Sequence, residues 1–333
     1  MVDVVCLGEV LVDFVAEDVN VALENVVRFR RAPGGAPANV ACGVVRLGGT
    51  AALVGKVGDD PFGRMLRRTL DDVGVDTSGL ATTAEARTTL AFVGVHRSGR
   101  KDMCFYRHPG ADMMLSAADI DAAEITSAKA LHFGSISLID PLPREATLRA
   151  ARIAREAGLL VTFDPNYRQD LWPSEAEARQ RIAEGLALAE VVKVSDEELS
   201  LVAGSDDPLT AAEYILAQGP RLVVISCGAE GSRAFLRSDA PGRSSSDCQT
   251  PGFPVRAVET TGAGDGFMAS LLVDLLAARD AGRQVAALGE DDLRRITQRA
   301  NAAGALTCTR AGAIPGLPNR GEVDRFLAGQ QSR

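Results

Sequence analysis

A single carboxylate stands among small residues in the segment VETTGAGDGF, residues 258–267. The residues after it are apolar at helical spacing, which predicts a helix facing a core: Phe267, Leu271, Leu272, Leu275 and Leu276. The first turn of such a helix has free N–H groups near Gly262, Ala263 and Gly264, and with the helix dipole they favour an anion such as phosphate. Asp265 would then be placed to take a proton from a hydroxyl group that attacks phosphorus.

The same segment also allows a purely structural interpretation. Thr260 or Thr261 could cap the helix, and Asp265 could be an acidic first-turn residue that complements the dipole. Taken alone, the segment does not decide between a base and a capping arrangement.

A second glycine-rich stretch, RRAPGGAPANVACGVVRLGG, covers residues 30–49. Gly34 and Gly35 can bring the backbone close to a ligand. Asn39 lies near the start of the helix that follows and offers both a donor and an acceptor. Asp13, at the end of GEVLVDF, is a polar residue among apolar ones, so it is either paired or functional. The alternative for this stretch is a turn followed by a helix cap.

Two common nucleotide-binding motifs are missing. TAALVGKV has Thr50 where a P-loop needs its first glycine and Val57 after the lysine, so Lys56 is expected on the surface. No GxGxxG follows the first predicted strand, where CLGEVLVDF stands instead. A P-loop kinase and a nicotinamide-dependent dehydrogenase are therefore disfavoured.

Composition favours small-molecule chemistry. The chain has 333 residues, 46% of them hydrophobic, and a net charge of −8 without a basic run, which argues against a nucleic-acid or membrane-surface binder. Its six cysteines are scattered and suggest neither a zinc site nor a disulfide framework. The amino terminus does not resemble a secretory leader. We expect a reduced, cytoplasmic protein.

Short apolar runs recur between stretches of helical spacing, at residues 3–8, 51–55, 130–134, 159–164, 191–195 and 221–226. This alternation predicts an α/β fold with a mostly parallel sheet flanked by helices. Ligands bind beyond the carboxyl ends of such strands. The residues there are small or polar: Gly8, Glu9, Gly134, Ser135, Asp164, Ser195, Asp196, Cys227 and Gly228.

Two segments depart from this rhythm. Residues 14–32 and 88–106 are typical of hairpin-like strands, the second turning at residues 98–100, and they predict a small β-sheet lid inserted in a single domain of residues 1–333. Residues 239–252 are expected to form a flexible loop.

GGAPANVACGVVRLGG and ETTGAGDGFMASLL resemble the two signature segments of the ribokinase-like (PfkB) family of carbohydrate kinases, in the same order and with similar separation. The resemblance extends from GEVLVDF to NAAGALTCTRAGA. FYRHPGADMML, LHFGSISLI and FDPNYRQDLWPS look most like fructokinases, although kinases of 2-keto-3-deoxygluconate share some of these features.

The resemblance implies roles for individual residues. Asp265 matches the catalytic base, and Gly262, Ala263 and Gly264 match the anion hole. The positions that match sugar-binding residues are Asp13, Gly34, Gly35 and Asn39. By analogy Arg107 and Arg168 face the cleft, one toward the sugar and the other toward the transferring phosphate; the alternative for both is a surface salt bridge.

The nucleotide side is implied by KVSDEELS, which stands where the family has an N-x-x-E motif. Glu198 matches the glutamate that influences magnesium and phosphate binding, whereas Ser195 replaces the asparagine. Other positions expected near the nucleotide are Lys193, Ser226, Gly228, Gly231 and Asn301.

A monovalent-cation site is also implied, at Glu259 and Thr261. Many relatives have Asp at the position of Glu259, where the backbone helps bind the ion. Potassium activation is accordingly expected, although the longer side chain could alter the loop.

The implied enzyme uses ATP and Mg²⁺ to phosphorylate D-fructose to fructose 6-phosphate, with a lid that excludes water and pairs between the subunits of a homodimer. One alternative keeps the fold but takes 2-keto-3-deoxygluconate, whose carboxylate needs a cationic partner. The other is a non-catalytic sugar-binding regulator.

Overall fold

A computed structural model describes residues 2–96, 101–237 and 246–331. Its main sheet has nine strands in the order β13-β12-β11-β10-β9-β8-β1-β4-β5. The strands of its parallel part are β1 (Val4–Leu7), β4 (Ala51–Gly58), β5 (Leu80–Thr83), β8 (Ala130–Gly134), β9 (Leu160–Asp164), β10 (Val191–Ser195) and β11 (Leu222–Ser226). Two antiparallel strands, β12 (Gly231–Leu236) and β13 (Ser246–Pro251), complete one edge. The expected mostly parallel sheet is confirmed.

Alternate residues of the strands enter two hydrophobic cores, one on each face of this sheet. Val4 and Cys6 pack into the first core and Val5 and Leu7 into the second. The first core is covered by α1 (Ala36–Arg46), α2 (Pro61–Val73), α8 (Ala263–Asp280), α9 (Glu290–Thr307) and α11 (Arg320–Gln331). The second is covered by α3 (Ala122–Thr126), α4 (Pro141–Glu156), α5 (Glu175–Leu188), α6 (Leu199–Ala203) and α7 (Pro208–Ala217). Helices thus flank both faces.

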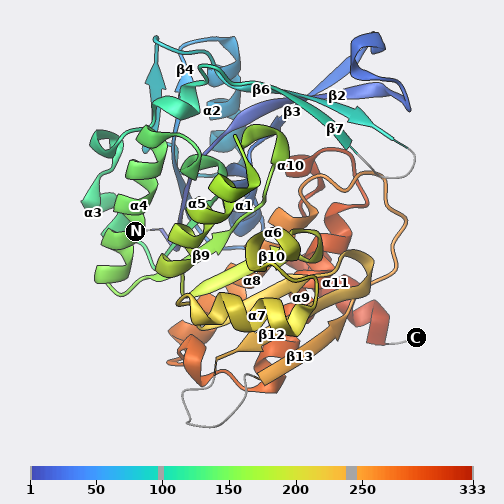
Figure 1. Ribbon diagram of the computed structural model, residues 1–333. Helices are drawn as coiled ribbons and strands as arrows, with labels where there is room; N and C mark the ends of the chain where they lie inside the picture. Colours follow the sequence, from blue (N-terminus) through green and yellow to red (C-terminus); the bar gives the residue numbers. More distant parts are fainter. Residues whose placement is uncertain (1, 97–100, 238–245, 332–333) are drawn as a thin grey trace.

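A second sheet extends beyond the main sheet at the top of Figure 1. Its strands are β3 (Phe29–Gly34), β2 (Leu11–Val19), β6 (Leu90–Val95) and β7 (Lys101–Tyr106), in that order. β2 and β6 are parallel and join two antiparallel hairpins. The small sheet was expected, but β2 begins before residue 14 and β3 ends after residue 32. The expected turn at residues 98–100 lies outside the described residues.

Two local expectations were wrong. Residues 246–251 form β13 and pair with β12, whereas a loop was expected over 239–252; residues 238–245 lie outside the described residues. Lys56 is not a surface residue, because only 13% of its side chain is exposed and its Nζ lies 2.7 Å from Asp119 Oδ2.

No helix among the described residues combines the length and apolarity needed to cross a bilayer.

Candidate active site

The amino terminus of α8 carries the glycines of the second signature segment, ETTGAGDGFMASLL. Gly262 is the N-cap, with φ of 83°, so neither Thr260 nor Thr261 stands at the N-cap position. The positive φ suits glycine, and a Cβ at Gly262 would lie 2.8 Å from Ala313 Cβ in α10 (Ala313–Gly316). The Ala263 N–H donates to the Thr260 carbonyl at 3.2 Å, and the N–H groups of Gly262 and Gly264 are left to bind an anion.

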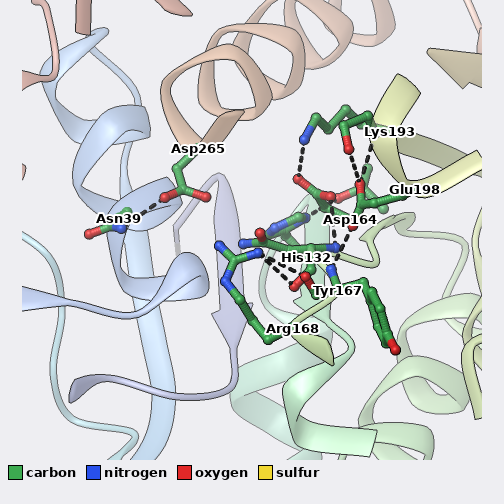
Figure 2. Close-up of polar contacts among 11 residues, drawn as sticks. Asn39, His132, Asp164, Tyr167, Arg168, Lys193, Glu198 and Asp265 are labelled. Carbon is green, nitrogen blue, oxygen red and sulfur yellow. Dashed lines mark hydrogen bonds and ion pairs between the residues drawn. The ribbon is translucent and has the colours of Figure 1, made fainter. Parts of the chain in front are cut away.

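Asp265 lies in this first turn and is joined to α1. Asn39 Nδ2 donates a hydrogen bond of 2.8 Å to Asp265 Oδ2, and both side chains are buried. Figure 2 shows the two pointing toward each other from different helices. Asn39 Oδ1 is buried and has no partner among the described residues, so it can accept a hydrogen bond from a ligand.

Lys193 and Asp164 form a buried ion pair beside the same helix terminus. Lys193 Nζ lies 2.9 Å from Asp164 Oδ2, and a Cβ at Gly264 would lie 3.1 Å from this Nζ. Burial raises the pKa of Asp164 to about 6, against the opposing charge of Lys193. Burial alone would lower the pKa of Lys193, but the surrounding carboxylates outweigh it and raise that pKa. The ammonium group therefore stays charged next to the anion site.

The Glu198 carboxylate is held by three donors. Its Oε2 accepts from the Ser195 backbone N–H at 2.8 Å and from the Ser195 hydroxyl at 2.7 Å, while its Oε1 accepts from the Tyr167 N–H (Figure 2). Ser195 therefore anchors Glu198 as part of a capping box. Ser195 is paired with Ser226 across β10 and β11, which brings both to the carboxyl edge of the sheet.

His132 lies on β8 behind this cluster and is 1% exposed. Its Nδ1 is 3.0 Å from Thr162 Oγ1. Burial and the nearby positive charge of Lys193 lower the pKa of His132 to about 3. The imidazole is therefore neutral at physiological pH and adds no second cation to the site.

The predicted sugar-side residues gather where β1, β2, β3 and α1 meet. Asp13 on β2 lies directly against Gly34, where any Cβ would collide with its carboxylate. Gly35 has φ of 104° and packs on the backbone of Glu9. Glu9 Oε1 accepts from the Ala36 N–H at 2.9 Å, and burial raises the Glu9 pKa to about 7. Glu9 was not predicted as a site residue, although its place after an apolar strand was a signal.

The two predicted arginines differ in their surroundings. Arg107 is 2% exposed, with ion pairs of 2.7 Å to Asp112 and 2.8 Å to Asp140. Its Nη2 is buried and lacks a partner in the described part of the chain. Arg168 Nη1 donates to the backbone carbonyls of Asn166 and Tyr167. Neither is a surface salt bridge, and their contacts with substrate stay predictions.

A family model described as pfkB family carbohydrate kinase matches residues 1–320. The chain belongs to this family. It is therefore a carbohydrate kinase, which transfers a phosphoryl group to a sugar, as the sequence had predicted. It is 44% identical to fructokinase-1 of Zea mays over 325 residues, which cover 97% of each chain.

Solved structures of the same family share its fold. Fructokinase from Xylella fastidiosa with bound ATP superimposes with a TM-score of 0.87 at 32% identity and covers 99% of both chains. A double mutant of fructokinase from Vibrio cholerae O395, bound to fructose, ADP and potassium ion, has a TM-score of 0.83 at 31% identity and covers 98% of both chains. These similarities support ATP as the phosphoryl donor.

The remaining residues predicted near the nucleotide lie at the edge formed by β11, β12 and β13. Gly228 is exposed just beyond β11. Gly231 has φ of 107°, and a Cβ there would collide with β13. Asn301 on α9 is buried, and its Nδ2 donates to the carbonyls of Thr250 and Pro251, each at 3.2 Å. Asn301 thus anchors β13, and nucleotide contacts of these residues stay predictions.

The predicted cation loop precedes Gly262 directly. Thr261 adjoins the cap, while Glu259 Oε2 accepts from Arg30 Nη2 and from the Gly312 N–H, each at 2.9 Å. Across residues 2–96, 101–237 and 246–331, no three or more His, Cys, Asp or Glu side chains are grouped to hold a metal ion. The Glu259 carboxylate is thus bonded to Arg30 and Gly312, while the implied cation site uses the backbone at this position, and cation contacts of Glu259 and Thr261 stay predictions.

Proposed function

We propose that this kinase transfers the γ-phosphoryl group of ATP to the 6-hydroxyl of D-fructose. The observation that carries the proposal is the buried contact between Asn39 and Asp265 at the open terminus of α8. It places a carboxylate and an amide, which suit the hydroxyl groups of a sugar, beside N–H groups that suit phosphate. The fructokinases among the relatives favour fructose as the acceptor.

In this mechanism Asp265 is the general base. It accepts the proton of the attacking hydroxyl late in phosphoryl transfer, when the oxygen has become acidic. The N–H groups of Gly262 and Gly264 stabilise the charge on the transferring phosphoryl group, while the Ala263 N–H, also predicted for this role, donates to the Thr260 carbonyl. Asn39 fixes the orientation of the carboxylate by donating to Oδ2.

The phosphate side combines fixed charges with ATP-bound Mg²⁺. Mg²⁺ usually keeps several waters and binds substrate phosphates, so the lack of a dedicated acidic cage in the described residues does not conflict with it. When bound, it neutralises phosphate charge. Glu198, already held by Ser195 and Tyr167, acts on it through its charge rather than as a direct ligand. The Lys193 ammonium group attracts the phosphates.

The second sheet is proposed to act as a lid that excludes water, because water would compete with the sugar as acceptor of the phosphoryl group.

One face of the second sheet carries a partly exposed aromatic cluster of Phe14, Phe29, Phe92 and Tyr106. Tyr106 is 66% exposed. Such a face suits pairing of two lids in a homodimer. Light scattering of the wild type and of Phe92→Glu tests the proposed homodimer. A wild-type dimer that becomes a monomer in Phe92→Glu would support pairing through this aromatic face.

The cytoplasmic location of the protein stays a prediction.

An acidic sugar such as 2-keto-3-deoxygluconate is the second candidate acceptor, because Arg168 has no carboxylate partner among the described residues. Its guanidinium group donates to two backbone carbonyls, neither of which is a carboxylate. It could pair with a sugar carboxylate.

A coupled assay of ADP release with fructose, ribose, 2-keto-3-deoxygluconate and adenosine tests the proposal. We expect kcat/KM to be highest for fructose, and phosphorus NMR to place the phosphate on carbon 6. A preference for 2-keto-3-deoxygluconate would favour the second candidate. Sugar binding without ADP release from any acceptor would instead support a non-catalytic regulator.

A further inference from the structure

Helix α1 takes its amino-terminal cap from another part of the chain. Its N-cap residue is Gly35, which has no side chain, and Pro37 at the second helical position has no N–H group. The N–H of Ala36 donates instead to Glu9 Oε1 at 2.9 Å. Glu9 lies 27 positions before Ala36, just beyond β1, and is 3% exposed. A buried carboxylate from the main sheet therefore caps this helix.

The backbone of Glu9 contacts the same turn. Gly35 has φ of 104°, and a Cβ at this position would lie 2.4 Å from the Glu9 carbonyl oxygen and 2.9 Å from Val10 Cα. Glu9 thus holds the Ala36 N–H with its side chain and packs against Gly35 with its main chain. Both contacts fix the turn that contains the predicted sugar-binding glycines, Gly34 and Gly35.

Helix α1 connects this turn to the proposed base. Its first turn carries Asn39, which donates to Asp265 on α8. Further along, the two helices lie close together, since a Cβ at Gly43 would lie 2.5 Å from Ala269 Cβ. With α8 packed along its length, the orientation of α1 depends on how its amino terminus is held. Glu9 therefore helps to set where Asn39 and the two glycines lie.

The Glu9 carboxylate is costly to the folded protein. Its Oε2 is buried and has no hydrogen-bond partner among the described residues. Burial raises the pKa of Glu9 to about 7, against the backbone hydrogen bonds and the charge of Arg107, while Asp112 acts in the same direction as burial. An amide at this position would keep one acceptor for the helix and remove the buried charge. The cap thus requires an acceptor that reaches Ala36 rather than a negative charge.

We propose that Glu9 is a positioning residue for sugar binding. By accepting from the Ala36 N–H, it holds Gly34, Gly35 and the first turn of α1 in the geometry that receives the sugar. This inference rests on the proposed kinase function, in which these glycines and Asn39 bind the sugar. Loss of the acceptor should weaken binding of the sugar more than binding of ATP, because the contacts of Glu9 lie on the sugar side.

Steady-state kinetics with fructose and ATP test the proposal. Glu9→Ala should lose about 10- to 100-fold in kcat/KM for fructose, mostly through a higher KM, because a small displacement of a binding turn has effects of this size. KM for ATP should stay within about twofold. Glu9→Gln retains an acceptor and should recover most of the loss. Asp207→Ala is the matched control, since Asp207 caps α7 through the Thr210 N–H and its removal should leave both KM values unchanged.

A double-mutant cycle isolates the hydrogen bond. Ala36→Pro removes the N–H donor and leaves Glu9 in place, and proline suits the first helical position. It should raise KM for fructose as Glu9→Ala does, and the combined variant should be no worse than either single variant. Melting temperatures give the same comparison without turnover. Each single variant should melt roughly 1 to 4 °C below the wild type, and the two losses should not add.

Three results would overturn the proposal: a wild-type KM for fructose in Glu9→Ala or Ala36→Pro, a Glu9→Gln variant as impaired as Glu9→Ala, or losses that add fully in the combined variant. If Glu9→Ala does not fold, Ala36→Pro and Glu9→Gln still give the first two comparisons with the wild type. A wild type that phosphorylates no sugar would overturn the proposed kinase function instead. The melting temperatures would then still decide whether the hydrogen bond of Glu9 holds α1.

Discussion

Asn39 and Asp265 are 226 positions apart in the chain and share a buried hydrogen bond of 2.8 Å. The bond joins the first turns of α1 and α8, the two helices that carry the glycine-rich segments. It therefore links the predicted sugar side to the predicted phosphate side at one carboxylate.

Asp265→Asn should retain the fold and ATP binding but lose about 10²- to 10⁴-fold in kcat, because an amide cannot accept the hydroxyl proton. Steady-state kinetics and nucleotide titration measure the two properties separately. Asp280→Asn is the control, since Asp280 is an exposed acid at the other end of the same helix. Turnover near the wild-type rate in Asp265→Asn would rule out its role as the base.

Asn39→Asp should move the acidic limb of the kcat/KM pH profile to higher pH by about one unit or more. The new carboxylate would face Asp265 at hydrogen-bond distance, and a like charge raises the pKa of a neighbouring acid. Asn39→Ala removes the hydrogen bond without adding charge, so its rate should fall without this displacement. Identical profiles for the two variants would contradict the interpretation.

Lys193→Met should lower the free energy of unfolding by about 3 kcal/mol, because it leaves Asp164 buried without its counter-charge. Urea unfolding measures the loss, and adding Asp164→Asn should restore part of it. Lys129→Met is the comparison: Lys129 pairs with Asp280 where the side chains are 39% and 57% exposed, so its loss should cost less than about 1 kcal/mol. Equal losses of unfolding free energy in Lys193→Met and Lys129→Met would show that burial of the pair of Lys193 and Asp164 does not affect its contribution.

His132 should make the protein less stable in acid. Its pKa is about 3 in the folded state, below the ordinary value of 6.5, so the unfolded chain binds the proton more readily. The contribution of neutral His132 to the free energy of unfolding is fully present above pH 6.5. It is lost as the pH falls toward 3, at up to about 1.4 kcal/mol per pH unit. His132→Gln should reduce this slope in urea titrations. A slope unchanged by the substitution would contradict the assignment.

Much of the fold could be predicted because hydrophobic periodicity is local. The six predicted strands all appear in the main sheet, and the apolar spacing after Asp265 gave α8. β13 was missed because its residues, Ser246–Pro251, are mostly polar. Its place at the sheet edge depends on pairing with β12 and on the amide of Asn301, which are contacts that no local pattern reveals.

The glycine-rich motifs of the site could be predicted from the sequence, but the pairings between its side chains could not. Gly262 and Asp265 lie at the start of α8 as expected. The pairing of Lys193 with Asp164 joins two strands, and the capping of α1 by Glu9 depends on how β1 ends against it. The substitution of Glu for Asp at 259 was visible in the sequence. Its partner Arg30 could not be predicted, because Arg30 lies on β3 and Glu259 lies in a loop 229 positions later.

The central position of β1 bears on how the protein is made. Val4–Leu7 are fully buried between β4 and β8, although they are translated before both of these strands. The strand on one side of β1 is complete at residue 58, but the strand on the other side is residues 130–134. All four strands of the second sheet lie within residues 11–106. On the ribosome, the second sheet can therefore assemble while the middle of the main sheet still has an open, aggregation-prone edge.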